Sequence, residues 1–127
     1  MKNIIYEDLV EVKDLPGRTL KWLITPQQQI TSRFSMNSVV IKPGSTVKPA
    51  HSHPNMEEVI YIISGNGRVF IDNTVSELRE GAVVLFKPGS VHMVRNDGDV
   101  DMKVLCFFTP PATLDDYKYF EEIQFPE

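Results

Sequence analysis

Three histidines and one glutamate are the residues of this sequence best suited to chemistry. Residues 51–53 read His-Ser-His, and in a β-strand the side chains of residues i and i+2 project from the same face. Two imidazoles placed in this way can hold one metal ion. Glu58 follows at the start of a run of strand-forming residues, and His92 comes just after the turn sequence Pro-Gly at 88–89. The candidate ligands therefore lie on or beside segments that predict strands.

The composition limits the classes of protein to be considered. The chain has 127 residues, which suits a single domain, and 13 basic and 17 acidic residues give a net charge of −4. Since no basic run is present, we expect no nucleic-acid partner. No apolar run approaches the about 20 residues that a membrane span needs. The single cysteine, Cys106, cannot form an internal disulfide, and acidic residues stand near the N-terminus where a signal peptide would be apolar. We therefore expect a cytoplasmic location and no membrane association.

Periodicity predicts an all-β fold. Residues 33–41 alternate between apolar and polar side chains, and four more segments are rich in Val, Ile, Tyr and Phe. These segments are residues 58–63, 68–71, 82–86 and 102–108. Glycine, proline, asparagine and aspartate cluster between them, as expected for turns. Short strands punctuated in this way favour a barrel or a sandwich over alternating helices and strands.

The two ends of the chain carry separate expectations. Thr113 and Asp116 have the spacing of a capping box, and Leu114 and Tyr117 continue at helical spacing, so we expect a short C-terminal helical segment closing one end of the barrel. Residues 4–12 predict an added strand, which could pair with a partner subunit. We expect one domain over residues 1–127, with its core at about 30–110, an N-terminal extension of strand and loop at 1–29 and a C-terminal tail at 111–127.

Two segments of the chain resemble the motifs of the cupin superfamily. Residues 44–65 read Gly-x6-His-Ser-His-x4-Glu-x6-Gly, which is similar to the first cupin motif. Residues 81–96 contain Gly-x2-His-x3-Asn and are similar to the second. The chain departs from the usual pattern at two points. Gly44 stands one residue farther from His51, and Lys87 replaces a proline. The fifteen residues between the motifs suit a small single-domain cupin.

The resemblance implies a fold and a ligand set. The fold would be a small antiparallel β-barrel, the double-stranded jelly roll. Carried over by position, the metal ligands would be His51, His53, Glu58 and His92. Glu57 and Glu58 would face opposite sides of a strand. Only Glu58 keeps the spacing to Gly65 and also turns Ile60 and Ile62 inward, so we assign the ligand to Glu58.

Such a site would favour oxygen donors that carry negative charge. Three neutral imidazoles and one carboxylate leave a divalent ion with one net positive charge and about two open positions on a six-coordinate ion. Nitrogen and oxygen ligands suit iron, manganese, nickel, cobalt or zinc, and affinity order does not choose among them. Ile60, Ile62 and Val94 share the strand phase of the ligands. They predict a largely apolar wall suited to a small organic ligand.

Several arginines could bind a substrate carboxylate with a two-pronged guanidinium contact. The candidates for this role are Arg18, Arg33, Arg68 and Arg95. Arg33 is the preferred candidate, because it would share a strand face with Ser35 and Asn37. Arg95 alternates away from His92 on the same strand.

Three functions remain open on these grounds. The first is a metal-dependent enzyme for a small oxygenated or anionic metabolite, with dioxygenases, decarboxylases, isomerases and lyases as the precedents that the resemblance implies. The second is a non-catalytic cupin that binds or senses a small ligand. The third is a structural barrel without metal, which the cost of burying an unpartnered polar cluster disfavours. Apolar residues near both chain ends also predict a homodimer.

Overall fold

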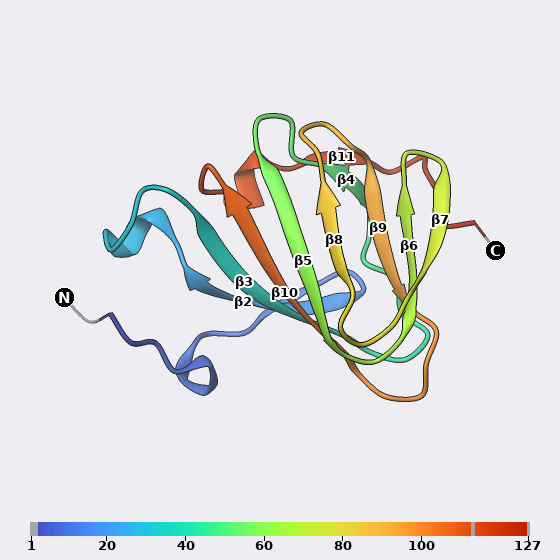
Figure 1. Cartoon of the computed structure of the whole chain (residues 1–127), viewed down its shortest axis with the longest axis horizontal. Coiled ribbons are helices and arrows are strands. Elements are labelled where there is room, and N and C mark those ends of the chain that lie inside the picture. The colour runs from blue at the N-terminus through green and yellow to red at the C-terminus, as the bar shows by residue number, and fades with distance from the viewer. Residues whose placement is uncertain (1–2, 113, 127) are drawn as a thin grey trace.

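Two antiparallel β-sheets face each other in the computed structural model, which describes residues 3–112 and 114–126 (Figure 1). The six-stranded sheet has the order β1-β2-β3-β10-β5-β8, and the five-stranded sheet has the order β11-β4-β9-β6-β7. The strands of the first are β1 (Lys13–Leu15), β2 (Arg18–Ile24), β3 (Ser35–Ile41), β10 (Met102–Thr109), β5 (Glu57–Ser64) and β8 (Val83–Phe86). Those of the second are β11 (Lys118–Phe120), β4 (Ala50–Ser52), β9 (His92–Asn96), β6 (Gly67–Ile71) and β7 (Thr74–Leu78). The predicted all-β jelly roll is confirmed.

Alternation along the strands builds the core between the sheets. On β5, Ile60 and Ile62 are fully buried while Tyr61 is exposed, as the sequence pattern predicts. β10 follows the same rule, with buried residues at every second position from Met102 to Phe108. The five-stranded sheet contributes Val69 and Val94 to the same cluster. The inward positions of both sheets therefore form one hydrophobic core, and the site described below lies at one end of it.

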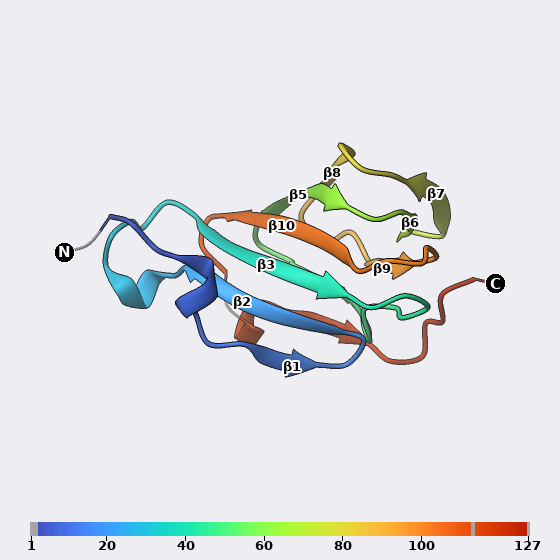
Figure 2. The ribbon, with the colours of Figure 1, turned by 90° about the horizontal axis from the view of Figure 1, so that it is seen from below.

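The N-terminal region differs from the prediction. Residues 4–12 form no strand but coil with one 3-10 turn, η1 (Glu7–Leu9). Glu7 anchors this segment through its side chain, which accepts hydrogen bonds from Lys103 at 2.7 Å and Ser38 at 2.5 Å. Within the expected strand and loop extension, β1 and β2 form at the edge of the larger sheet (Figure 2). A second 3-10 turn, η2 (Pro26–Gln28), leads toward β3.

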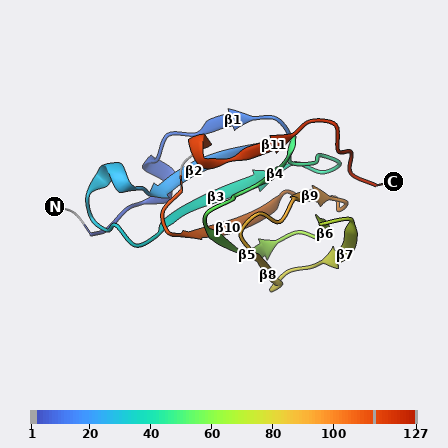
Figure 3. The same ribbon diagram turned by 90° about the horizontal axis from the view of Figure 1, so that it is seen from above.

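The predicted C-terminal helix is wrong. The described part of the segment has a single 3-10 turn, η3 (Leu114–Asp116), and then β11. Thr113, the expected capping residue, lies outside the described residues. β11 pairs with β4, so that Tyr119 stands opposite His51 (Figure 3). Pairing with an open sheet edge satisfies the backbone better than an isolated helix of two turns would. The segment therefore adds an edge strand to the five-stranded sheet.

No helix in the described ranges is long and apolar enough to cross a membrane.

Candidate metal centre

The predicted ligands come together from both sheets. His51 on β4 pairs directly with His92, the first residue of β9, and His53 lies just beyond the end of β4. Glu58 is the second residue of β5 in the opposite sheet. All four side chains are buried. Among the residues that the structure describes, the three histidines form a group whose ligand atoms all lie within 4.8 Å of one another.

The ligand atoms converge without forming hydrogen bonds. Glu58 Oε1 lies 2.9 Å from His53 Nε2 and 3.1 Å from His92 Nε2. These are hydrogen-bond distances, yet in the described structure none of the three atoms has a partner in hydrogen-bonding orientation. Buried polar atoms are rarely left in this way, because each costs about 1–3 kcal/mol. Lone pairs aimed at a common point fit a divalent metal ion.

Two of the imidazoles are oriented by the backbone. The carbonyl oxygens of Pro49 and Ser90 lie 3.0 Å from His51 Nδ1 and 3.1 Å from His92 Nδ1. A carbonyl oxygen only accepts hydrogen bonds, so each Nδ1 is the protonated nitrogen and each Nε2 keeps a free lone pair. This is the arrangement by which metal-binding histidines are commonly fixed.

Aromatic side chains hold the rings in place. Phe86 stacks on His92 with the ring centroids 3.7 Å apart and the planes at 8°. Tyr117 stacks on His51 at 5.0 Å and meets the ring of His53 edge-on at 4.3 Å. The centre is therefore a buried, closely packed environment, in which electrostatic interactions are strong.

The charge states suit metal binding. Burial lowers the pKa of His51 well below its usual value, and the neighbouring His92 lowers it further, so His51 is neutral near pH 7. Burial alone would raise the pKa of Glu58, but polar contacts with His53 and His92 outweigh it and hold that pKa below its usual range. One neutral imidazole and one ionised carboxylate are thus ready to act as ligands.

A cavity of about 50 Å³ adjoins the ligands. Its wall is mostly apolar and includes the predicted Ile60 and Val94, whereas Ile62 is buried without lining it. Cys106 and Tyr117 also line the cavity, and burial raises the pKa of both groups well above their usual values. Both therefore remain protonated at neutral pH and add no charge.

The structure brings two further polar groups to this cavity and leaves one expected group away from it. Arg18 and Asn37 line the cavity. Arg33 is exposed and does not line it, because β3 begins only at Ser35 and the alternation does not extend back to residue 33. Lys87 is also exposed. In the sequence, the alternation of Arg18 with Leu20 after the turn at Gly17 indicates that Arg18 faces inward. The spacing of Tyr117 from Leu114 predicts a helix, whereas Tyr117 lies directly before the strand β11.

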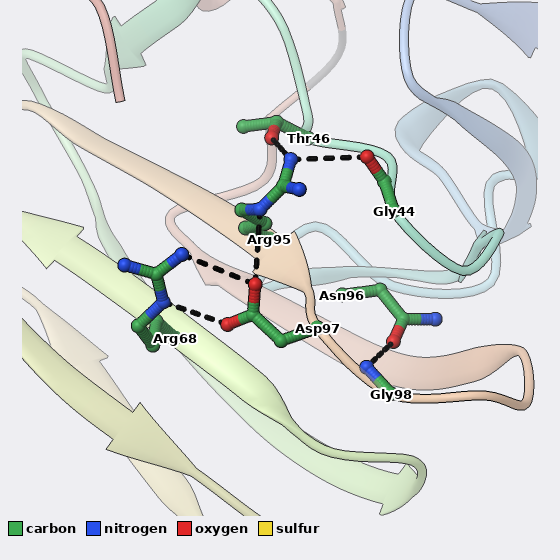
Figure 4. A network of polar contacts seen from close by, with 7 residues as sticks. All are labelled: Gly44, Thr46, Arg68, Arg95, Asn96, Asp97 and Gly98. Atoms are coloured by element: carbon green, nitrogen blue, oxygen red, sulfur yellow. Dashed lines mark hydrogen bonds and ion pairs between the residues drawn. The ribbon is translucent and has the colours of Figure 1, made fainter. Parts of the chain in front are cut away.

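The second motif also forms a network of polar contacts at the other end of β9 (Figure 4). Asn96 donates hydrogen bonds to the carbonyl oxygens of Ile41 and Val100, and it accepts one from the Gly98 backbone. The predicted turn-stabilising role of Asn96 matches these contacts. Arg95 reaches the loop of the first motif at Gly44, so the network ties the two motifs together.

Comparison with known proteins places the chain in a family. The family model described as "Cupin domain" matches residues 37–108, more than half of the chain. The chain belongs to the cupin family. An uncharacterised protein of Methanocaldococcus jannaschii is 29% identical to this cupin over 105 residues, covering 83% of each chain.

Solved structures agree on the fold. Ectoine synthase from P. lautus matches this cupin with a TM-score of 0.76 at 18% identity, covering 94% of this chain and 90% of the other. The nucleoside dehydratase Pac13 of Streptomyces matches with a TM-score of 0.78 at 13% identity, covering 94% and 92%. At these identities the likeness shows the shared barrel alone.

Proposed function

We propose that this cupin is a metal-dependent enzyme that acts on a small oxygenated or anionic metabolite. The ligands are His51, His53, Glu58 and His92, and the metal is iron, manganese, nickel, cobalt or zinc. The observation that supports this most is the convergence of three buried ligand atoms without hydrogen-bond partners in the described structure. The reaction would be of the dioxygenase, decarboxylase, isomerase or lyase type.

The chain's own residues define what the site would do. A divalent ion, when bound, would supply Lewis-acid polarisation of a substrate oxygen. Carbonyl contacts at His51 and His92 fix the imidazoles, so little reorganisation is needed during a reaction. The apolar wall excludes water and accommodates a short carbon skeleton. The enzymes named above, ectoine synthase and Pac13, support the proposal to the extent that the same barrel hosts catalysis in them.

Elemental analysis of the purified protein tests the proposal. The protein is prepared without a polyhistidine tag and without chelators, beside a His51→Ala variant. We expect about one equivalent of a transition metal per chain, and its loss in the variant. An absence of metal after anaerobic reconstitution, with the protein folded, would refute the proposal.

The alternative is a cupin that binds or senses a small molecule without transforming it. The protonated states of Cys106 and Tyr117 favour this alternative, because neither group is a ready general base. Recovery of a bound ligand chemically unchanged, after aerobic incubation with metal-loaded protein, would support it over the enzyme.

We also propose a homodimer in the cytoplasm. The outer face of the six-stranded sheet exposes Tyr61, Leu85 and Phe107, and the N-terminal segment exposes Leu9. Contiguous apolar surface of this kind commonly marks an interface, and a second copy of the chain is the partner we propose. Light scattering should give twice the mass of one chain, and Leu85→Glu should lower it. A mass of one chain for the unaltered protein would contradict the dimer.

A further inference from the structure

We propose that Arg18 and Asn37 recognise a small carboxylate that also carries a hydroxyl or carbonyl oxygen. Both residues line the cavity that adjoins the histidine cluster. The inference rests on the proposed function, because it names the class of substrate for that same cavity.

Arg18 is a buried cation with unused hydrogen-bonding capacity. Its side chain lies on β2 with the residue only 8% exposed. Nη1 donates to the carbonyl oxygens of Lys48 at 2.9 Å and Pro16 at 3.1 Å. Within the described part of the chain, Arg18 has no ion pair with a carboxylate, and its Nε and Nη2 have no hydrogen-bond acceptor. Burial penalises a charge that has no directly paired carboxylate, and an anionic ligand would offset that penalty.

Asn37 is a second unpartnered group on the same wall. It is 1% exposed, and neither its Nδ2 nor its Oδ1 has a hydrogen-bond partner among the described residues. Its cross-strand neighbours on β2 and β10 are Trp22 and Cys106. An amide can donate to one oxygen and accept from a hydroxyl, so Asn37 is suited to a neutral oxygen function rather than to a hydrocarbon.

The charge of the cavity favours an anion. Among its lining residues, Glu58 is the only carboxylate; it contacts the imidazoles of His53 and His92 as well as Cys106, and it forms no ion pair with Arg18. With a divalent ion bound, the cavity would have two net positive charges. The small volume and apolar wall limit the ligand to a short carbon chain.

A purely structural role for Arg18 explains only part of these observations. Its bonds to Pro16 and Lys48 brace the turn before β2 against the segment that leads to His51. Gly17 serves the same close packing, because a Cβ at this position would overlap the carbonyl of Thr46. This bracing uses Nη1 alone, and it does not account for the unpartnered amide of Asn37.

The test compares short hydroxycarboxylates with their matched analogues. The probes are glycolate, 3-hydroxypropionate and malate at millimolar concentrations, each beside its amide, which lacks the charge, and the parent acid without the hydroxyl. Binding is measured by calorimetry and by NMR chemical shifts, on both metal-free and zinc-loaded protein. Thermal unfolding is recorded for every variant, so that bracing and ligand recognition are separated.

Arg18→Gln should remove the preference for acid over amide, weakening binding of the acid by about tenfold to a hundredfold, the worth of a charge-assisted hydrogen bond. Arg18→Lys should retain part of that preference. Asn37→Leu, which nearly conserves volume, should remove the preference for the hydroxy acid over its parent acid. Arg33→Gln is the matched control for an exposed arginine and should change neither preference.

Equal affinity of the unaltered protein for acids and amides, or failure of every acid to bind, would overturn the inference. So would an unchanged acid preference in folded Arg18→Gln protein. The metal-free measurement separates this inference from the proposed function. An Arg18-dependent acid preference in a protein that binds no metal would refute the metal enzyme and retain the carboxylate site. Metal binding without a preference for acids would retain the proposed metal centre and refute the carboxylate site.

Discussion

The two ends of β9 hold polar clusters of opposite character. At its start, His92 meets Glu58 with both groups buried and with no hydrogen-bonding orientation between them. At its end, Asp97 is partly exposed and accepts well-oriented hydrogen bonds from Arg68 at 2.7 Å and Arg95 at 3.0 Å. The groups of the second cluster are paired with one another, whereas those of the first lack hydrogen-bond partners in the described structure, as expected of a ligand-binding site.

The two clusters therefore differ in role: the one at the end of β9 stabilises the barrel, and the one at its start is suited to binding. Asn96, fully buried, uses its amide on three backbone groups and joins the ends of strands that are distant in sequence. Paired groups of this kind stabilise the folded chain directly. The unpaired imidazoles and carboxylate cost folding free energy until a cation binds, so they are expected where function requires them.

The largest effect should come from Glu58. Glu58→Gln keeps the shape of the side chain but removes the negative charge from the histidine cluster. We expect metal affinity to fall by about a hundredfold or more, as measured by competition with a chelator. Glu57→Gln alters the exposed neighbour on the same strand and should leave affinity unchanged. Equal affinity of Glu58→Gln and the unaltered protein would remove Glu58 from the ligand set.

Asn96 should show the reverse behaviour. Asn96→Ala leaves the carbonyls of Ile41 and Val100 and the Gly98 amide without their partner. The free energy of unfolding should fall by about 3 kcal/mol in urea titrations. Metal content per folded chain should stay the same. If metal were lost while the protein remained folded, the two ends of β9 would not be independent.

Asp97 should have a smaller and pH-dependent effect. Hydrogen bonds and charge from Arg68, with a further contribution from Arg95, hold the pKa of Asp97 below its usual value. The resulting stability is present above the unfolded-state pKa of about 3.9, and it is lost as the pH falls further toward the folded-state pKa. Asp97→Asn should therefore cost about 1 kcal/mol or less at pH 7 and almost nothing in strong acid. A cost independent of pH would show that these ion pairs do not contribute as charges.

The smallest effect on metal binding should come from Cys106. Its thiol is fully buried beside the cavity, and burial raises its pKa well above the usual value. We expect slow reaction with a thiol reagent in native protein and rapid reaction in denaturant. Cys106→Ala should retain full metal content. Metal loss in this variant would show that the thiol contributes to the metal centre. The centre would then not consist of nitrogen and oxygen donors alone.

Much of the candidate site was predictable because its signals are local. The His-Ser-His spacing and the phase of Glu58 against Ile60 depend only on the two-residue repeat of a strand, which tertiary packing does not alter. The same rule failed for Arg33, since it lies before the first residue of β3. Across the turn at Gly17 the same repeat places Arg18 inward with Leu20, and both residues are buried.

The sequence by itself determined the all-β class, the candidate ligands and the family, because these follow from residue types at fixed short spacings. Only the tertiary structure decided that residues 118–120 form a strand on the edge of β4, which brings Tyr117 against His51. It alone placed Arg18 and Asn37 on one cavity wall with the histidine cluster. These residues are far apart along the chain, and their proximity depends on strand order and register, which no local pattern encodes.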